Sequence, residues 1–395
     1  MRERGQTRRK RVAVIGATGS VGSSVLDVCR AYPDRLEVVA LAAGRNLEKL
    51  VALSAEFGVK TLCLAEETAV KSFAGNNLPQ GAKLLLGPET MISLVQDPDL
   101  DHVVFASSGT SAIEALQAAL RAGKEVSLAN KESIVVGGPW VMPLVQRPNQ
   151  LRPLDSEHNA IWQCLQGEIE KPRKIYLTAS GGPFRNYSFE ELQRVTPEMA
   201  LRHPVWSMGA KISIDSATLM NKGIELIEAM TLFGLKPSQL EALISPGSFV
   251  HGLVEFEDGC VKMLAGEPDM RLPAASCLFW PERLPQRDGF SRPGFSGRTL
   301  SFDLADETRF PALRLAKEAL TKGDAYPALL VGADEIAVDR FMKGLLSFSA
   351  IPEVVEETMA AYSGAVPNSL VSALSVLEWG RERCAAICES KILTK

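Results

Sequence analysis

The chain has 395 residues, more than one hydrophobic core usually supports, so we expect two or three domains. Hydrophobic residues make up 46% and charged residues 23%, a balance typical of globular proteins and too apolar for a disordered chain. The net charge of −4 gives no reason to expect a nucleic-acid partner.

The seven cysteines are scattered and lack the paired spacings of zinc sites, which indicates thiols in a reducing compartment. The arginine-rich segment 1–11 is followed by a predicted strand rather than by the apolar region of a secretory signal. No stretch approaches the roughly 18–20 apolar residues that a membrane helix needs. We therefore expect a cytoplasmic protein without a membrane partner.

The first 130 residues alternate short apolar strands with amphipathic helices. The predicted strands are Val12–Ile15, Val38–Leu41, Thr61–Leu64, Val103–Phe105 and Glu125–Leu128. The predicted helices between them are Val21–Arg30, Leu47–Phe57 and Ala112–Ala122. This alternation predicts right-handed βαβ units and a parallel sheet, so we assign residues 1–150 to a Rossmann-like nucleotide-binding domain of an α/β protein.

A glycine-rich turn follows the first predicted strand. Its glycines are spaced Gly-x-x-Gly-x-x-Gly, so that backbone N–H groups can approach a pyrophosphate at the start of a helix. The residues expected to contact a dinucleotide here are Gly16, Thr18, Gly19, Ser20 and Val21. The alternative is that the glycines serve only a tight turn.

The second predicted strand runs into Gly44, Arg45 and Asn46, with no carboxylate to hold a ribose 2′-hydroxyl. A cation and an amide at this point suit a 2′-phosphate, so NADPH is favoured over NADH. A solvated surface arginine is the alternative for Arg45. After the strand Glu125–Leu128 comes Asn130-Lys131-Glu132, which places Lys131 where it could reach both nicotinamide and substrate.

Beyond residue 150 the pattern changes to an α+β arrangement. Strands are predicted at Lys174–Leu177, Val250–Phe256 and Cys260–Leu264, and helices at Ala312–Lys322, Ala333–Lys343, Ile351–Tyr362 and Val366–Ser390. We expect a catalytic domain over residues 151–284, a linker over 285–311 and a helical domain over 312–395.

Asp155-Ser156-Glu157 places two carboxylates on one side of an extended chain, which suits Mg²⁺ or Mn²⁺. The alternative is a helix start with Ser156 as the capping residue. Further on, Asn221 and Lys222 precede Glu225 by four and three residues, so the three share a helix face. This face suits phosphate capture beside a metal-binding carboxylate; a solvated, salt-bridged face is the alternative.

Between these segments, Ser180-Gly181-Gly182-Pro183 forms a turn that can offer N–H groups and a hydroxyl to an oxyanion. The glycines and prolines around His203 and Trp206 are typical of a mobile lid, which we place at residues 181–210. Simple packing of Trp206 is the alternative.

Taken together, these segments resemble the 1-deoxy-D-xylulose 5-phosphate reductoisomerase family. The motifs that carry the resemblance, in addition to those above, are Arg202-His-Pro, Trp206-Ser-Met-Gly209, Lys211-Ile-Ser, Asp215-Ser-Ala-Thr218, Met220-Asn-Lys-Gly223 and Gly266-Glu-Pro-Asp-Met-Arg271. Their order and spacing match from about residue 11 to about residue 380. Any one motif is weak, but the set is highly specific.

The resemblance implies roles for individual residues. Metal ligands and catalytic residues would be Asp155, Glu157 and Glu225, with Lys131 and His203 also catalytic. The substrate and its phosphate would be held by Lys131, Ser156, Glu157, Ser180, His203, Ser216, Asn221, Lys222 and Glu225, with Trp206 and Met270 closing over them. Asn130, Glu132 and Gly209 would join the glycine turn around NADPH.

The family's reaction, as the resemblance implies it, is both an isomerisation and an oxidoreduction. A ketose phosphate is cleaved by a retro-aldol step and rejoined as a branched aldehyde, which NADPH reduces to 2-C-methyl-D-erythritol 4-phosphate. This step belongs to isoprene biosynthesis by the methylerythritol phosphate pathway. A metal (magnesium or manganese) stabilises the enediolate, and a phosphate anchor and lid hold the fragments together. The family is homodimeric.

Three segments depart from the family pattern: 107–113, 245–247 and Asp334, where the family usually has a glycine-rich loop, His-Pro-Gln and asparagine. Two alternatives to a reductoisomerase follow. One is a simple NADP-dependent reductase of a phosphorylated carbonyl compound, which would not need the clustered carboxylates. The other is a non-catalytic NADPH-binding sensor, in which replacing Asp155 or Glu225 would change nothing.

Overall fold

The computed structural model describes residues 8–72, 78–202, 209–285, 287, 289–290 and 292–393. The chain divides into two compact units. The first unit comprises Met1–Ser133, Val141–Asn159 and Asp269–Ser291, and the second comprises Ile134–Trp140, Ala160–Pro268 and Arg292–Lys395. No helix among the described residues is long and apolar enough to cross a membrane.

The first unit contains a seven-stranded parallel sheet, which confirms the predicted α/β class. Its strands are β1 (Lys10–Ile15), β2 (Leu36–Ala43), β3 (Thr61–Leu64), β4 (Lys83–Leu86), β5 (His102–Phe105), β6 (Glu125–Leu128) and β7 (Leu151–Pro153). Their order is β4-β3-β2-β1-β5-β6-β7. Strands β4 and β7 were not predicted, because β4 is a partly exposed edge strand and β7 has only three residues.

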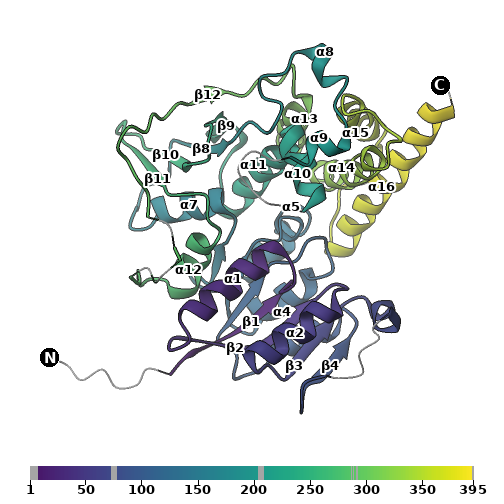
Figure 1. The fold of residues 1–395 in the computed structure, drawn as a ribbon. Helices are drawn as coiled ribbons and strands as arrows, with labels where there is room; N and C mark the ends of the chain where they lie inside the picture. The colour runs from purple at the N-terminus through teal and green to yellow at the C-terminus, as the bar shows by residue number, and fades with distance from the viewer. Residues whose placement is uncertain are drawn as a thin grey trace. The chain divides into compact units, whose positions relative to one another are not determined.

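The main helices of this unit are α1 (Ser20–Ala31), α2 (Leu47–Phe57), α3 (Thr90–Val95), α4 (Ile113–Arg121) and α12 (Arg271–Phe279), with a 3-10 turn at Glu67–Ser72 and another at Met142–Leu144. Helices α1, α2 and α4 match the predicted crossovers, whereas α3 and α12 were not predicted. Helices α1, α2 and α12 share one hydrophobic core with β1–β3. Figure 1 shows α1 and α2 beside these strands.

The strand order reverses between β1 and β5, which are neighbours in the sheet. The chain runs outward from β1 to β4 on one side and from β5 to β7 on the other. In open parallel sheets, ligands bind at the carboxyl ends of the strands where the order reverses. This geometry draws attention to the turns that follow β1, β5 and β6.

The second unit has a five-stranded mixed sheet. Its strands are β8 (Lys174–Ala179), β9 (Leu240–Ile244), β10 (Val250–Glu255), β11 (Val261–Ala265) and β12 (Asp303–Leu304), in the order β11-β10-β8-β9-β12. Only β8 and β9 run parallel to each other. Strands β9 and β12 were not predicted; β12 has two residues and lies within the segment expected to be a linker.

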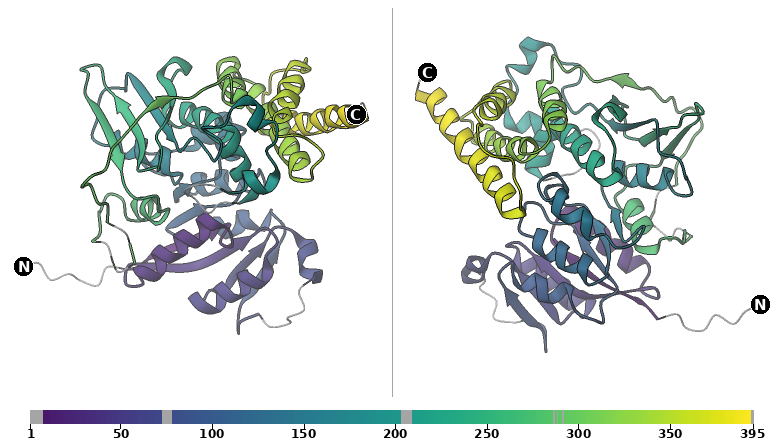
Figure 2. Two further views of the ribbon diagram at one scale, coloured as in Figure 1. Left: turned by 45° about the horizontal axis from the view of Figure 1, so that its top comes forward. Right: turned by 180° about the vertical axis from the view of Figure 1, so that it is seen from behind.

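The remaining elements are mostly helical. They are α5 (Glu132–Val135), α6 (Gly138–Val141), α7 (Ser156–Cys164), α8 (Phe189–Leu192), α9 (Pro197–Ala200), α10 (Ala210–Thr218), α11 (Met220–Phe233), a 3-10 turn at Pro237–Gln239, α13 (Pro311–Lys322), α14 (Tyr326–Met342), α15 (Ala350–Ala360) and α16 (Leu370–Leu393). Figure 2 gives two further views of them. The four C-terminal helices confirm the predicted helical region. The prediction began α14 seven residues too late: the helix starts at Tyr326, with Pro327 in its first turn, where proline is tolerated.

Candidate active site

The glycine turn after β1 is built by backbone close approach. Gly16 has φ +87°, a left-handed conformation, and a Cβ there would collide with the backbone N of Ser107. A side chain at Gly22 would collide with the carbonyl oxygen of Gly16, so only glycine lets α1 pack against the turn. Gly19 is the N-cap of α1 and provides no side-chain acceptor. The first N–H groups of α1, from Ser20 onward, can therefore serve a phosphate.

The second cofactor segment lies at the end of β2, where Gly44, Arg45 and Asn46 are exposed. Asn46 caps α2, since its Oδ1 accepts the backbone N–H of Lys49 at 3.0 Å. The amide predicted to face the 2′-phosphate thus also fixes the start of the helix. Lys49, which sequence analysis missed, donates to the carbonyl oxygen of Thr18 at 3.0 Å. The sequence signal that could have identified Lys49 was its position, one helical turn after Asn46.

Asn130, at the end of β6, organises the loop that follows β5. It is 1% exposed, and its Nδ2 donates to the carbonyl oxygens of Ser107 and Gly109 at 2.9 and 2.8 Å. Its Oδ1 accepts the backbone N–H of Ser133 at 2.8 Å, beside Glu132 at the start of α5. Loop 107–113, one of the segments that depart from the family pattern, is therefore held at the glycine turn by Asn130, which was predicted to contact NADPH.

The end of β7 carries the first two candidate metal ligands. Asp155 forms an ion pair with Lys131, and His158 Nδ1 lies 3.4 Å from Asp155 Oδ1. Asp155 Oδ1 also accepts the backbone N–H of Glu157 at 3.2 Å, so Asp155, rather than Ser156, caps α7. Ser156 donates its hydroxyl to Glu157 at 2.8 Å. The segment is thus a helix start that also presents two carboxylates.

Glu225 on α11 is the third candidate ligand, and it is 1% exposed. It accepts hydrogen bonds from Asn221 Nδ2 at 2.5 Å and from Lys222 Nζ, the contacts that helical spacing predicted. Asp155, Glu157 and Glu225 form a group of three carboxylates that could hold a metal ion. Three carboxylates fit Mg²⁺ or Mn²⁺, which take oxygen ligands.

The candidate phosphate-binding residues lie on neighbouring elements of the second unit. Ser180 follows β8 and accepts the backbone N–H of Gly182 at 3.2 Å. Gly182 has φ +68°, and a Cβ there would lie 2.7 Å from the carbonyl oxygen of Ser216, so the turn packs tightly on α10. Leu219, with φ +63°, forms the bend between α10 and α11, since it is the C-cap of the first helix and the N-cap of the second.

The lid prediction is only partly covered by the described residues. His203 and Trp206 lie outside them, so their predicted roles stay predictions. Helices α8 and α9 come before residues 203–208, and Gly209, directly after them, is the N-cap of α10. Met270 is the N-cap of α12.

Two departures from the family pattern have clear structural settings. Asp334 is fully buried on α14, and Lys211 Nζ lies 2.6 Å from both Asp334 and Asp215. Burial, and then the Asp334 carboxylate, raise the pKa of Asp215 well above its usual value. The segment 245–247 is the turn between β9 and β10, where Ser245 donates its N–H to Ala179 at 2.8 Å.

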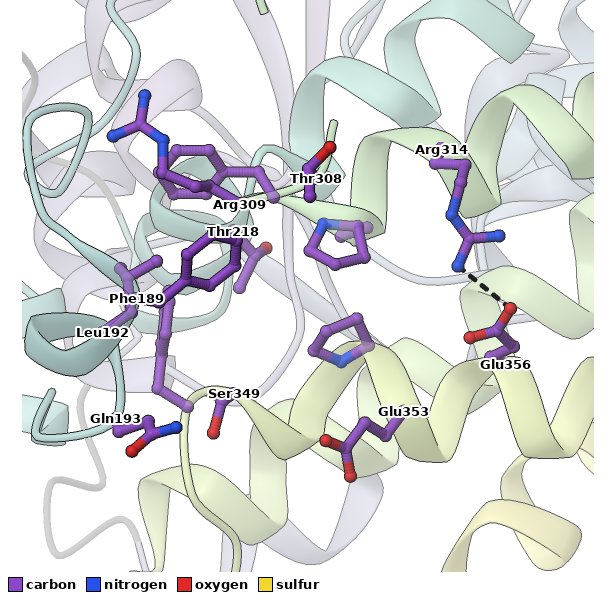
Figure 3. Close-up of a pocket in the computed structure, with 15 residues that line it drawn as sticks. Phe189, Leu192, Gln193, Thr218, Thr308, Arg309, Arg314, Ser349, Glu353 and Glu356 are labelled. Carbon is purple, nitrogen blue, oxygen red and sulfur yellow. Dashed lines mark hydrogen bonds and ion pairs between the residues drawn. The ribbon is translucent and has the colours of Figure 1, made fainter. Parts of the chain in front are cut away.

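A cavity of about 330 Å³ lies in the second unit, away from these residues. Phe189 and Leu192 of α8 line it, as Figure 3 shows. Pro311 of α13 and Pro352 of α15 also line it. None of the described candidate site residues lines this cavity. Its volume therefore does not identify the reaction site.

Three sequence models match the chain. A model described as 1-deoxy-D-xylulose 5-phosphate reductoisomerase matches residues 12–138. The model of that enzyme's C-terminal domain matches residues 151–233, and a second model, described as DXP reductoisomerase C-terminal domain, matches residues 265–383. Together they cover most of the chain.

Individual proteins are similar over nearly the full length. The chain is 43% identical over 381 residues to the 1-deoxy-D-xylulose 5-phosphate reductoisomerase of Prosthecochloris aestuarii, covering 96% of this chain and 99% of that protein. It resembles the solved enzyme from Zymomonas mobilis in complex with NADPH, with a TM-score of 0.86, 38% identity, and coverage of 97% and 100%. A DOX-P reductoisomerase in complex with NADPH, fosmidomycin and magnesium has a TM-score of 0.86, 36% identity, and coverage of 97% and 98%.

Proposed function

The chain belongs to the 1-deoxy-D-xylulose 5-phosphate reductoisomerase family, and we propose that the residues described above form its active site. It is a metal-dependent NADP oxidoreductase that converts 1-deoxy-D-xylulose 5-phosphate to 2-C-methyl-D-erythritol 4-phosphate in isoprenoid precursor synthesis. The observation that carries the assignment of the site is this group of three carboxylates, which could hold a metal ion.

Asp155, Glu157 and Glu225 would hold the divalent metal. When bound, the metal supplies Lewis-acid stabilisation of developing negative charge, and NADPH supplies the hydride. Lys131 lies against Asp155, where its ammonium group can orient a substrate oxygen and donate a proton. Ser156, adjoining both acids, would position the same part of the substrate.

The substrate phosphate would bind at the beginning of α11. Asn221 and Lys222 are in the first turn of this helix, whose N-cap, Leu219, has no side-chain hydrogen bond. The first N–H groups and the Lys222 ammonium group together favour a dianion. Ser180 and Ser216, tied together through Gly182, would add hydroxyl groups. Anchoring the phosphate keeps the larger fragment in place while carbon–carbon bonds change.

NADPH would lie along the carboxyl ends of β1 and β2. The N-terminus of α1 would receive the pyrophosphate, and Arg45 with Asn46 would receive the 2′-phosphate. Asn130 supports this arrangement because it holds the loop that packs on Gly16. Glu132 and Gly209 would contact the nicotinamide end, and the lid with His203 and Trp206 would close over the substrate with Met270.

Three further proposals concern the protein as a whole. We assign cofactor binding to residues 1–150, catalysis to 151–284 and a helical domain to 312–395, joined by 285–311. We propose a homodimer, supported by exposed apolar residues on the edge strands of the second sheet. A cytoplasmic location is supported by cysteines that are free in the structure, six of the seven being buried.

The test is NADPH oxidation in the presence of 1-deoxy-D-xylulose 5-phosphate, with and without Mg²⁺ or Mn²⁺, with identification of the product. We expect metal-dependent formation of the branched methylerythritol phosphate. Asp155→Asn should lower kcat at least about 100-fold, because it removes a charged ligand and the capping acceptor of α7 changes little.

Glu114→Gln, on the exposed face of α4, serves as the matched control and should keep full activity. Metal-independent reduction without isomerisation would instead identify a simple reductase. Undiminished metal-dependent activity of Asp155→Asn would refute the ligand assignment.

A further inference from the structure

Lys49 lies in the first turn of α2, immediately after the segment Gly44–Asn46. Its backbone N–H is fixed by the Asn46 side chain at 3.0 Å, so the start of the helix determines where its side chain leaves. Although Lys49 is exposed, its Nζ donates to the carbonyl oxygen of Thr18 at 3.0 Å and to Ser23 Oγ at 3.1 Å. The ammonium group therefore lies on the glycine turn, between α1 and α2.

Both acceptors of Lys49 are neutral. A lysine pays a considerable conformational entropy to hold one position, and two neutral acceptors on the surface offset little of it. An anion bound beside the ammonium group would stabilise this position. Thr18 belongs to the turn proposed to receive the pyrophosphate, and Lys49 is one helical turn from Arg45 and Asn46. The ammonium group thus stands between the two sets of phosphate-binding residues.

The local charge balance gives Lys49 further weight. Glu66, after β3, donates its N–H to the carbonyl oxygen of Gly44 at 2.9 Å. Its Oε1 lies 4.0 Å from the position that a Cβ on Gly44 would occupy. A carboxylate this close to the 2′-phosphate segment opposes a dianion, and Arg45 alone would only balance it. Glu48, in the first turn of α2, is a second carboxylate of the segment, and Lys49 is the cation that offsets it.

We propose that Lys49 is a cofactor-specificity residue, which braces the glycine turn and supplies the second positive charge for the phosphates of NADPH. The inference rests on the proposed function, because it takes NADPH as the cofactor. A charge that serves mainly the 2′-phosphate favours NADPH over NADH, which lacks that group. A lysine that only braces the turn affects both cofactors alike.

The experiment is fluorescence titration of the full-length protein with NADPH and with NADH, for the wild type, Lys49→Met, Lys49→Arg and Lys60→Met. Lys60, exposed at the start of β3, is the matched control. We expect Lys49→Met to raise the Kd for NADPH about tenfold and the Kd for NADH less than about twofold. Lys49→Arg should stay within about threefold of the wild type, and NADPH binding by Lys49→Met should depend less on salt.

Equal weakening of NADPH and NADH binding, or an unchanged Kd in Lys49→Met, would overturn this inference alone. Failure of the wild-type protein to bind NADPH would overturn the proposed function and this inference with it. The melting temperature of each variant shows whether a lost affinity reflects unfolding.

Discussion

Asp215 and Asp334 are two buried carboxylates that share the ammonium group of Lys211. One positive charge cannot balance two ionised acids, and Asp215 Oδ1 and Asp334 Oδ1 have no hydrogen-bond partner in the described structure. Burial and the second carboxylate therefore raise the pKa of Asp215 and favour its protonated form. The departure at position 334 is thus a change in buried charge next to Ser216.

We predict that Asp334→Asn stabilises the protein, and more so as pH rises. In the folded state Asp215 keeps its proton to a higher pH than in the unfolded state, where the ordinary aspartate pKa is 3.8. Stability from this proton is complete below that pH and declines as pH rises toward the raised pKa. Asparagine removes the second acid, so the free energy of unfolding at pH 8 should increase by about 1–2 kcal/mol.

Urea unfolding at pH 5 and pH 8 measures this difference. Asp339→Asn provides a control on the same helix, because Asp339 is exposed and pairs with Lys343 at 2.8 Å. A variant Asp334→Asn that is less stable than the wild type at pH 8 would contradict the account.

At the scale of elements, α12 is held to the first sheet by charges beneath its C-terminal end. Arg152 on β7 donates to the carbonyl oxygen of Cys277 at 2.6 Å, and Lys10 on β1 donates to that of Leu278 at 2.8 Å. Both cations also contact Glu125 on β6, at 3.1 and 3.0 Å. Cations at a helix C-terminus are favourable, so these contacts add to the hydrophobic packing that joins α12 to the first unit.

In this network the lysine, the arginine and Glu125 are charged, and the histidine, His102, is neutral. Burial lowers the pKa of His102 to about 4, and its Nε2 lies 2.7 Å from Ser127 Oγ. Burial opposes ionisation of Glu125, but contacts with His102, Arg152 and Lys10 hold the pKa of Glu125 well below its usual range. Glu125 therefore stays an acceptor for both cations.

We predict that Arg152→Met lowers the free energy of unfolding by about 3 kcal/mol, since it leaves a buried helix-end carbonyl and part of Glu125 without a donor. Urea unfolding gives the loss, and hydrogen exchange should show faster opening of α12 than of β2. Arg121→Met, exposed in the last turn of α4, is the control. Unchanged stability of Arg152→Met would show that the network does not hold α12.

At the scale of the whole molecule, the second sheet has exposed apolar side chains on both edge strands. Val261 and Met263 lie on β11, and Leu304, which is 76% exposed, lies on β12. Unpaired edge strands with apolar residues invite pairing with another chain. A second copy of this chain is the partner that the homodimer proposal assigns to them.

We predict that the 42.8 kDa chain sediments at twice that mass, and that Leu304→Glu shifts the equilibrium toward the monomer by at least about tenfold in Kd. Sedimentation equilibrium measures the change. Ile169→Glu is the control, because Ile169 is exposed outside both sheets. A monomeric wild type would refute the dimer, and a Leu304→Glu dimer of unchanged affinity would place the interface elsewhere.

Local patterns in the sequence were sufficient for much of the fold and part of the site. The alternation of strands and helices predicted the parallel sheet, because each element must bury one face. The spacing of Asn221, Lys222 and Glu225 predicted their contacts, since residues three and four apart meet on a helix. The glycine spacing predicted the turn at Gly16, because its left-handed φ of +87° and the nearby backbone of Ser107 leave no room for a side chain.

The tertiary structure decided what local spacing does not encode. It placed the Lys49 ammonium group on Thr18 and set Asp334 against Lys211, 123 residues away in sequence. Such contacts depend on how elements cross and pack, and many sequences with the same local pattern would not make them. The sequence alone thus determined the elements and the family resemblance. Only the packed chain determined which charges meet, because a charge that is buried without a partner is strongly unfavourable.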